Sequence, residues 1–423
     1  MQSTPTATRR APAAVICAVL LSASARADTL LVGEGAPYED IQTAVDAAAP
    51  GDTVLVLPGV YPSFAVDKTL TIIGAGPALT NVFNPGFFGG HTALVRDIDA
   101  SETLVLSGLN LLPAFPATLD FGVVDIADCQ GLVVLHNLAI DGNTANCAIR
   151  ATRASALVAS AVSASGNGNA IYPFPLYLES TTAWLSSTHV TEQNQPSVFQ
   201  ETVLAGGGAL RSSLFLYNST ISGANIDPPF FSPGGDGLSL RDSSLQLVRS
   251  GLFGGQGFGM AMGGHGARLE GTSHLMSYPD SSVFGGLDGE GQVMQEPLLL
   301  EAGALADFAQ SLAPSLHVQT PTVFSGDNLS LELFGAPAST GTLLVSLGMG
   351  TPLEVPTVLG TLFLNPATVI SLGSHALDAS GTAAFALAVP DLSELQGKLV
   401  VFQFLAPEGM RLSLSNPGVV SLL

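Results

Sequence analysis

The sequence predicts an all-β protein: a solenoid of stacked coils with an N-terminal helix cap, followed by a small antiparallel β-sandwich. Segments of alternating apolar and polar residues recur from residue 93 to 286, an amphipathic pattern at 38–49 precedes them, and turn-separated β runs replace them after 313. Recurrence every 20–50 residues is typical of solenoids. We therefore divide the chain into three parts, residues 1–27, 28–312 and 313–423.

The first residues have the three-part layout of a secretory signal peptide. Arg9 and Arg10 precede an apolar run at 13–23, and the small-x-small triplet at 25–27 offers a cleavage site after Ala27. The run is too short to span a bilayer comfortably, which takes about 20 residues. We expect a secreted or cell-surface protein with no membrane span in the mature chain.

Residues 38–49 are expected to form a helix that covers the first coil. Ile41, Ala44, Val45 and Ala48 fall on one stripe of such a helix. The end of a solenoid exposes an apolar core and open strand edges, so a cap is physically required there.

Four motifs follow one another between residues 38 and 77. They are Ile41-Gln42, Ala48-Ala49-Pro50-Gly51-Asp52, Pro58-Gly59-Val60-Tyr61 and Leu70-Thr71-Ile72-Ile73-Gly74. In this order they resemble the opening sequence of right-handed parallel β-helix proteins of the pectin-lyase-like superfamily, of the exported bacterial type. With the repeats, the resemblance covers about residues 38–290 and implies a right-handed parallel β-helix. It implies no single activity, because the superfamily includes polysaccharide lyases, glycosidases, epimerases, phage tailspikes and surface proteins.

Eight positions repeat along the solenoid at steps of 24 to 33 residues. Uneven steps place insertions in the loops while the strands keep their length. We take the following residues as equivalent and expect the Ile, Leu and Val among them to stack inside: Ile73, Leu106, Leu135, Ala159, Leu185, Leu216, Val248 and Met276. An error of one residue in this register would turn a side chain to the opposite face.

After residue 313 the corner pattern disappears, and short β runs alternate with Gly, Pro and Asp turns. This spacing is typical of an antiparallel sandwich. The expected strands lie at 328–335, 342–348, 360–365, 368–373, 381–390, 398–407 and 411–416. A continued solenoid is the alternative, but the turn spacing shortens here. The arrangement resembles the sandwich appended to exported bacterial repeat proteins.

The chain is strongly acidic. Its formal net charge is −21, and loss of residues 1–27, with three arginines and no acid, changes it to −24. We expect no nucleic-acid partner, because phosphate binding needs clustered cations.

We also expect no resident cofactor. Five early-coil aspartates have the hard oxygen ligands that suit calcium, although corner aspartates mostly bond turn backbone and no calcium loop of fixed spacing is present. They are Asp97, Asp99, Asp125, Asp128 and Asp141.

Two cysteines remain in the mature chain, Cys129 and Cys147. In an oxidising compartment a pair favours a disulfide. The two residues are 18 apart, six fewer than the local step of 24 residues, so they do not occupy equivalent places in neighbouring coils. An offset of six residues along a strand is roughly 20 Å. A bridge needs Cα atoms within about 7 Å. A disulfide and two buried thiols both stay open, because a corner could fold the two residues together.

A single histidine motif points to catalysis. Gly264-His265-Gly266 resembles one motif of the polygalacturonase branch, whose Asn-Thr-Asp, Asp-Asp and Arg-x-Lys motifs have no counterpart here. Asp236 lies 29 residues before His265, close to one coil, so the two could stack as an acid–base pair. A Gly-Gly-Asp-Gly run is also a good turn sequence. We expect proximity without a working site, since no second carboxylate or nearby cation is evident, and expect Asp236→Ala to leave folding intact.

Two proline-aromatic insertions are the candidates for a ligand face. Aromatic side chains supply a large, flat contact area, and these insertions extend the longest coils. The candidate residues are Tyr172, Phe174 and Tyr177 in one insertion and Phe230 and Phe231 in the other. Loops of this composition also pack simply on the flank of a solenoid.

These observations favour an exported, non-catalytic β-helix protein for surface structure, adhesion or glycan contact. The expected partner is a polysaccharide or a cell-surface component. The alternative is a divergent polysaccharide lyase or glycoside hydrolase that acts on acidic polysaccharide through Asp236 and His265. The sequence leaves the oligomeric state open.

Overall fold

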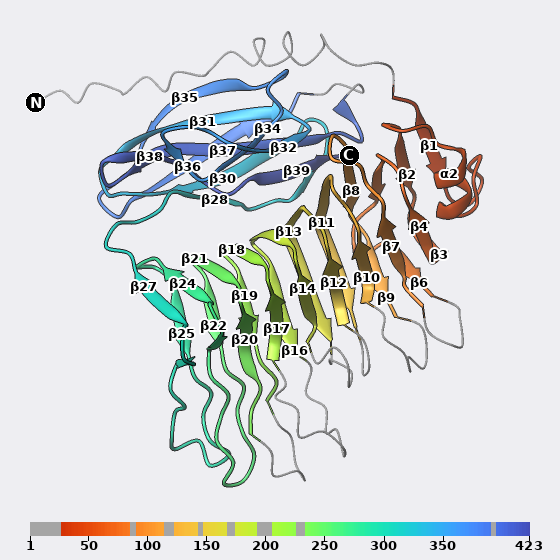
Figure 1. The fold of residues 1–423 in the computed structure, drawn as a ribbon. Helices are drawn as coiled ribbons and strands as arrows, with labels where there is room; N and C mark the ends of the chain where they lie inside the picture. Colours follow the sequence, from red (N-terminus) through yellow and green to blue (C-terminus); the bar gives the residue numbers. More distant parts are fainter. Residues whose placement is uncertain are drawn as a thin grey trace, which may run out of the picture.

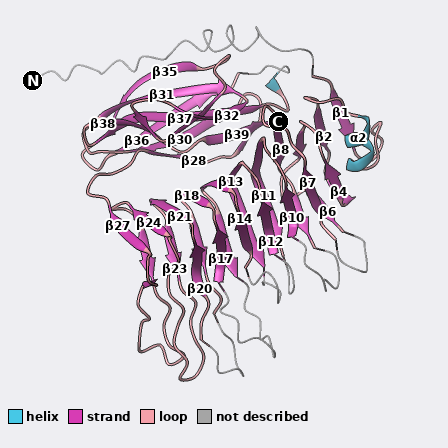
Figure 2. Cartoon of the chain, in the orientation of Figure 1, coloured by secondary structure: helices cyan, strands magenta, loops and turns pink. Residues whose placement is uncertain are grey.

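The computed structural model describes residues 27–84, 90–113, 122–142, 147–166, 174–192, 205–225, 233–390 and 395–423. Apart from one short helix, the described chain is all-β: a parallel β-solenoid leads into a C-terminal domain of separate antiparallel sheets (Figure 1, Figure 2). The predicted fold class is confirmed. Among these residues, no helix has the length and apolarity of a membrane-spanning segment.

The helix covers the N-terminal end of the solenoid, as predicted. Helix α2 (Ile41–Ala47) begins later than the sequence pattern suggested, because Asp40 is its N-cap and accepts a hydrogen bond from the backbone N–H of Thr43 at 2.8 Å. Ile41 and Val45 are buried in the core of the solenoid. The apolar stripe therefore closes this end of the core.

The coils of the solenoid contribute strands to two sheets. In both sheets, strands pair in parallel with the equivalent strands of neighbouring coils. Sheet A contains β1 (Thr29–Val32), β2 (Thr53–Val56), β3 (Gly59–Pro62), β5 (Thr71–Gly74), β6 (Thr80–Phe83), β8 (Thr103–Ser107), β9 (Asn110–Leu112), β11 (Leu132–Asp141), β13 (Ala156–Gly166), β15 (Thr182–Ser186), β16 (His189–Glu192), β18 (Ser213–Tyr217), β19 (Thr220–Ser222), β21 (Ser244–Val248), β22 (Gly251–Phe253), β24 (His274–Ser277), β25 (Ser282–Phe284) and β27 (Leu305–Phe308). Sheet B contains β4 (Phe64–Val66), β7 (Ala93–Arg96), β10 (Gly122–Ala127), β12 (Cys147–Thr152), β14 (Leu176–Glu179), β17 (Ala205–Leu210), β20 (Asp236–Arg241), β23 (Ala267–Glu270) and β26 (Leu298–Leu300). Inward-facing side chains of both sheets fill one apolar core.

One buried row contains most of the predicted inward positions. Leu106, Leu135, Ala159, Leu185 and Leu216 pair with one another in successive coils, and all are buried in the solenoid core. The predicted register is correct for these five coils.

The alignment of equivalent positions is wrong by one residue at Ile73, Val248 and Met276, and the inward prediction is therefore wrong for Ile73 and Val248. Ile72 and Leu247 occupy the inward row in place of the first two, and Met276 pairs along the outward row. Val248 is nevertheless buried, because the C-terminal domain covers it. Apolar residues on both faces of a strand remove the alternation that fixes its register.

Rows of hydroxyl side chains connect neighbouring coils at the corners. The backbone N–H of Thr181 donates to Oγ of Ser212 at 3.1 Å, that of Ser212 to Oγ of Ser243 at 3.0 Å, and that of Ser243 to Oγ of Ser273 at 3.2 Å. Each hydroxyl satisfies a buried amide that the ladder leaves free. A second row of this kind runs through Thr188, Ser219, Ser250 and Ser281.

Glycines let the long loops pack backbone against backbone. A Cβ atom on Gly255 would overlap the carbonyl oxygen of Ala224, and one on Gly264 would overlap that of Gly235. The high glycine content of residues 251–291 therefore reflects the close approach of neighbouring chain segments.

Gly255→Ala is expected to lower the free energy of unfolding by about 1–3 kcal/mol, the usual cost of overpacking a filled site. Urea unfolding followed by circular dichroism measures the change. Gly335→Ala is the matched control, because the nearest atom to its added Cβ is the end of the Leu377 side chain at 3.1 Å. Equal effects of the two substitutions would contradict the backbone overlap.

The C-terminal domain contains all the predicted strands and further short ones. Its strands are β28 (Ser315–Val318), β29 (Thr322–Val323), β30 (Asn328–Phe334), β31 (Thr340–Leu347), β32 (Met349–Glu354), β33 (Val358–Leu359), β34 (Thr361–Leu364), β35 (Ile370–Ala376), β36 (Thr382–Ala388), β37 (Leu399–Glu408), β38 (Arg411–Leu414) and β39 (Gly418–Leu422). Strand β30 pairs antiparallel with β28 and β36, and β37 pairs antiparallel with β31, β38 and β39. Side chains from these sheets share one apolar core, as in a sandwich.

The C-terminal domain packs along one flank of the solenoid (Figure 1). Outward-facing Val134, Val158 and Trp184 of sheet A form one buried apolar cluster with Phe363 and Val401 of the domain. The ring of Trp184 meets that of Phe363 edge-on, with centroids 5.0 Å apart. The single tryptophan of the chain is therefore an interface residue and is not available to a ligand.

Candidate functional site

The outward face of sheet B carries a row of polar and aromatic residues. Arg150, Tyr177, Gly208, Ser239 and Arg268 lie in register on successive coils. Neighbouring strands are about 4.8 Å apart, so several residues of the row can contact one extended ligand.

Two aromatic side chains from the predicted ligand face meet in the middle of this row. Phe174 stacks on Tyr177, with ring centroids 6.2 Å apart and an interplanar angle of 10°. Phe174 lies over Gly208, where an added Cβ atom would press into its ring. A hollow of about 260 Å³ opens beside the rings, and Ser239 and Arg241 also line it. The other predicted residues of this face, Tyr172, Phe230 and Phe231, lie outside the described residues.

Ion pairs between neighbouring coils flank the hollow. Arg241 contacts Glu270 at 2.6 Å, and Arg211 contacts Glu179 at 2.7 Å. The hydrogen bond to Glu270 raises the pKa of the Arg241 guanidinium. Tyr177 donates its hydroxyl to Glu179 at 3.2 Å. These charges are paired, so the face offers a ligand hydrogen-bond donors and acceptors around two aromatic rings.

Two of the early-coil aspartates lie close to basic side chains. Nε of Arg153 contacts Oδ1 of Asp128 at 2.5 Å, and this hydrogen bond lowers the pKa of the carboxyl. Asp125 is buried and lies 3.0 Å from Nδ1 of His91 and 3.5 Å from Nε of Arg150. Within the part of the chain that the structure describes, no group of three His, Cys, Asp or Glu residues could hold a metal ion.

Asp236 and His265 lie on adjacent coils but do not form an open acid–base pair. Oδ1 of Asp236 accepts a hydrogen bond from the backbone N–H of His265 at 2.7 Å, and Oδ2 accepts one from Nε of Arg268 at 2.7 Å. Asp236 is only 1% exposed. The His265 ring points elsewhere, with Nδ1 at 2.9 Å from the carbonyl oxygen of Glu296.

Arg268 is the residue of this site that sequence reasoning missed. It follows His265 by three residues in the chain and contacts a carboxylate 32 residues earlier. That spacing matches the repeat step, so the cation could have been found in the sequence. A buried carboxylate that binds a guanidinium and the amide of the next coil, rather than amides of its own turn, has the arrangement of a structural ion pair.

Cys129 and Cys147 are free, buried thiols. Burial raises the pKa of both thiols. Because the thiolate is the reactive form, neither residue has the environment of a catalytic cysteine. The sequence left open a disulfide or two buried thiols, and the structure contains two separate thiols.

Comparison with protein-family models finds no match to this chain, and comparison with curated proteins finds none either. Among solved structures, the sporulation control protein Spo0M from Bacillus subtilis aligns with 27% of this chain at 8% identity and a TM-score of 0.17. The alignment spans 50% of the Spo0M chain. A likeness this small carries no argument about function. The class of protein is therefore defined by the fold alone, a parallel β-solenoid with an appended β-sandwich.

Proposed function

We propose that this protein is an exported, non-catalytic β-helix protein of the pectin-lyase-like type that contacts glycans through the outward face of sheet B. The Phe174–Tyr177 stack beside a polar hollow is the observation that carries the proposal. Aromatic rings pack against the apolar faces of sugar rings, and a few convergent polar groups fix orientation. Ser239, Arg241 and Glu270 supply those groups here.

The buried Asp236–Arg268 pair supports a non-catalytic role. Hydrolysis or elimination at a glycosidic bond needs a carboxyl group or base that reaches the substrate. Both carboxylate oxygens of Asp236 are engaged by protein groups. The alternative function, a lyase or hydrolase for acidic polysaccharide, requires this ion pair to open.

The N-terminal sequence and the charge support an extracellular setting. Residues 1–27 have the layout of a signal peptide, and removal after Ala27 leaves a strongly acidic chain. Such a surface repels nucleic acid. A polysaccharide or a cell-surface component is the partner that fits this setting.

Phe174→Ala is expected to weaken glycan binding about tenfold, because a stacked aromatic contact contributes about 0.5–1.5 kcal/mol beyond its buried area. Calorimetric titration of the mature chain with neutral and uronic-acid oligosaccharides measures this. Phe324→Ala is the matched control, since Phe324 is exposed on the C-terminal domain.

Absence of binding to every oligosaccharide would overturn the proposed glycan contact. The same samples, assayed on uronic-acid polymers, also test the catalytic alternative. New reducing ends or unsaturated products that disappear in Asp236→Asn would replace the non-catalytic role with an enzymatic one.

A further inference from the structure

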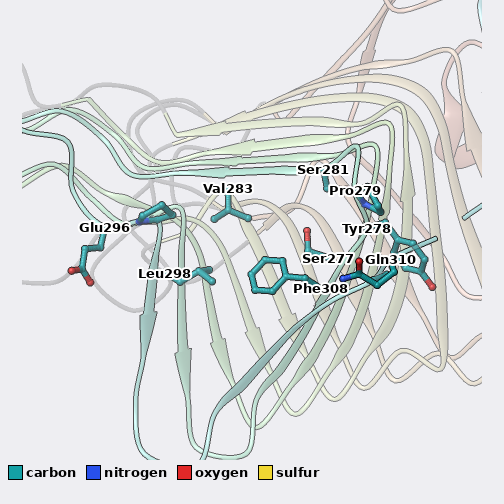
Figure 3. Close-up of a pocket in the computed structure, with 11 residues that line it drawn as sticks. Ser277, Tyr278, Pro279, Ser281, Val283, Glu296, Leu298, Phe308 and Gln310 are labelled. Atoms are coloured by element: carbon teal, nitrogen blue, oxygen red, sulfur yellow. The ribbon is translucent and has the colours of Figure 1, made fainter. Parts of the chain in front are cut away.

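The C-terminal end of the solenoid core is open. The inward rows of the preceding coils continue into the last coil and end at Val283, Leu298, Leu300, Ala306 and Phe308. Leu300 is 46% exposed and Phe308 is 62% exposed, whereas their counterparts one coil earlier are buried. Figure 3 shows Val283, Leu298 and Phe308 around the resulting hollow, which measures about 760 Å³.

The strands of this last coil also have a free edge. β25, β26 and β27 pair with β22, β23 and β24 of the preceding coil. Residues 233–390 are described without a gap, and no other strand of the described chain pairs with these three. Helix α2 covers the opposite end of the solenoid. An unpaired edge above an open apolar core is a template for one more strand.

The charge around this end is negative. Glu296 lines the hollow, Glu301 directly follows β26, and Asp307 lies on the outward row of β27, where it contacts Nε2 of His274 at 2.8 Å. No lysine or arginine occurs from residue 269 to 397. A second copy of this end would therefore bring like charges together, whereas a basic segment is complementary to it.

We propose that the open end binds an extended segment of a partner protein in which basic and apolar residues alternate. The segment adds to the free edge of β27 as a further strand, and main-chain hydrogen bonds hold it there. Because alternate side chains of a strand point to opposite faces, its apolar residues enter the hollow beside Phe308. Its lysines or arginines then face Asp307 and Glu301.

A blocked heptapeptide in which lysine alternates with valine is the probe for this site. The mature protein is expected to bind it with a Kd on the order of micromolar, more weakly as salt rises, because exposed charge pairs are screened. The same peptide with glutamate in place of lysine is expected not to bind. N-methylation of the peptide amides that face β27 is expected to abolish binding.

Two substitutions locate the site. Phe308→Ser is expected to weaken peptide binding at least about tenfold, and Asp307→Asn to weaken it less and to flatten its salt dependence. Val60→Ser and Asp46→Asn are the matched controls, since both residues are exposed at the capped end. Unfolding midpoints confirm that all four variants are folded.

Three results would overturn the proposal. They are no binding of the lysine peptide, equal binding of the glutamate peptide, and unchanged affinity in Phe308→Ser. Concentration-dependent dimers that Phe308→Ser abolishes would show that a second copy covers this end instead. None of these outcomes depends on the sheet B face, so the glycan proposal stands or fails separately.

Discussion

Asp236→Ala is expected to lower the free energy of unfolding by about 3 kcal/mol, the lower part of the range for removing one partner of a buried ion pair. The substitution leaves the Arg268 guanidinium and the His265 amide without the carboxylate that both contact at 2.7 Å. The lower figure applies because the Arg268 side chain is 23% exposed and water can partly replace the lost contact. This expectation reverses the one from the sequence, where Asp236→Ala is expected to leave folding intact because the Gly-Gly-Asp-Gly run is a good turn sequence.

Urea unfolding of the wild type and the variant measures the loss. Asp236→Asn separates charge from shape, because the amide keeps one acceptor oxygen of the same size. Glu270→Gln is the matched control on the same sheet. Its partner Arg241 is largely exposed, so the change is expected to stay below about 1 kcal/mol. If Glu270→Gln lowered the free energy of unfolding as much as Asp236→Ala does, burial of the Asp236–Arg268 pair would not be the cause of the large loss.

The solenoid and its cap could be predicted because their signals are local. The stripe of α2 and the repeated strand pattern each lie within a short stretch of sequence. The register failed at Ile73 and Val248, where both faces of a strand carry apolar residues. Val248 is apolar on its outward side because the C-terminal domain covers it, and that contact joins residues far apart in the chain.

The candidate site could be predicted only in part, for a related reason. Phe174 and Tyr177 stood out as aromatic residues in one insertion. The hollow beside them also needs Gly208 and Ser239, which come from later coils. Loops of unequal length separate those coils, so the shared row becomes visible only when the strand pairing is known. The open end at Phe308 depends in the same way on which strands pair.

Acid is expected to weaken the contact between the solenoid and the C-terminal domain. His136 is buried at this interface, where Nε2 lies 2.8 Å from the carbonyl oxygen of Pro321. Burial lowers the pKa of its imidazole to about 4. His317, across the same interface, lies 2.9 Å from Oγ of Ser187, and burial lowers the pKa of this imidazole too.

The charged neighbours of His317 act in both directions. Glu332 raises the pKa of His317, while Arg249 and His189 lower it. Burial is the largest cause and sets the direction of the shift. Burial and backbone hydrogen bonds, and no charged neighbour, account for the lowered pKa of His136. The effect of burial can therefore be tested at His136 without the effect of a neighbouring charge.

The sign follows from proton binding in the two states. The unfolded chain binds a proton on His136 below pH about 6.5, whereas the folded chain does so only near pH 4. The stability that neutral His136 contributes is therefore complete above the pKa of this imidazole in the unfolded chain. It is lost as the pH falls toward the pKa of the same imidazole in the folded chain, about 4. The loss from this group approaches about 3 kcal/mol.

His136→Gln is expected to remove most of this acid sensitivity, because glutamine does not titrate and its amide can still donate to Pro321. Unfolding free energies at neutral and mildly acidic pH, measured for wild type and variant, test the expectation. His274→Gln is the matched control, because this histidine of β24 lies outside the domain interface and its side chain is 41% exposed. If His136→Gln loses as much stability in acid as the wild type, the domain interface is not the acid-sensitive element. Limited proteolysis in acid that cuts the connection at 309–314 in the wild type but not in the variant would place the loss at the interface itself.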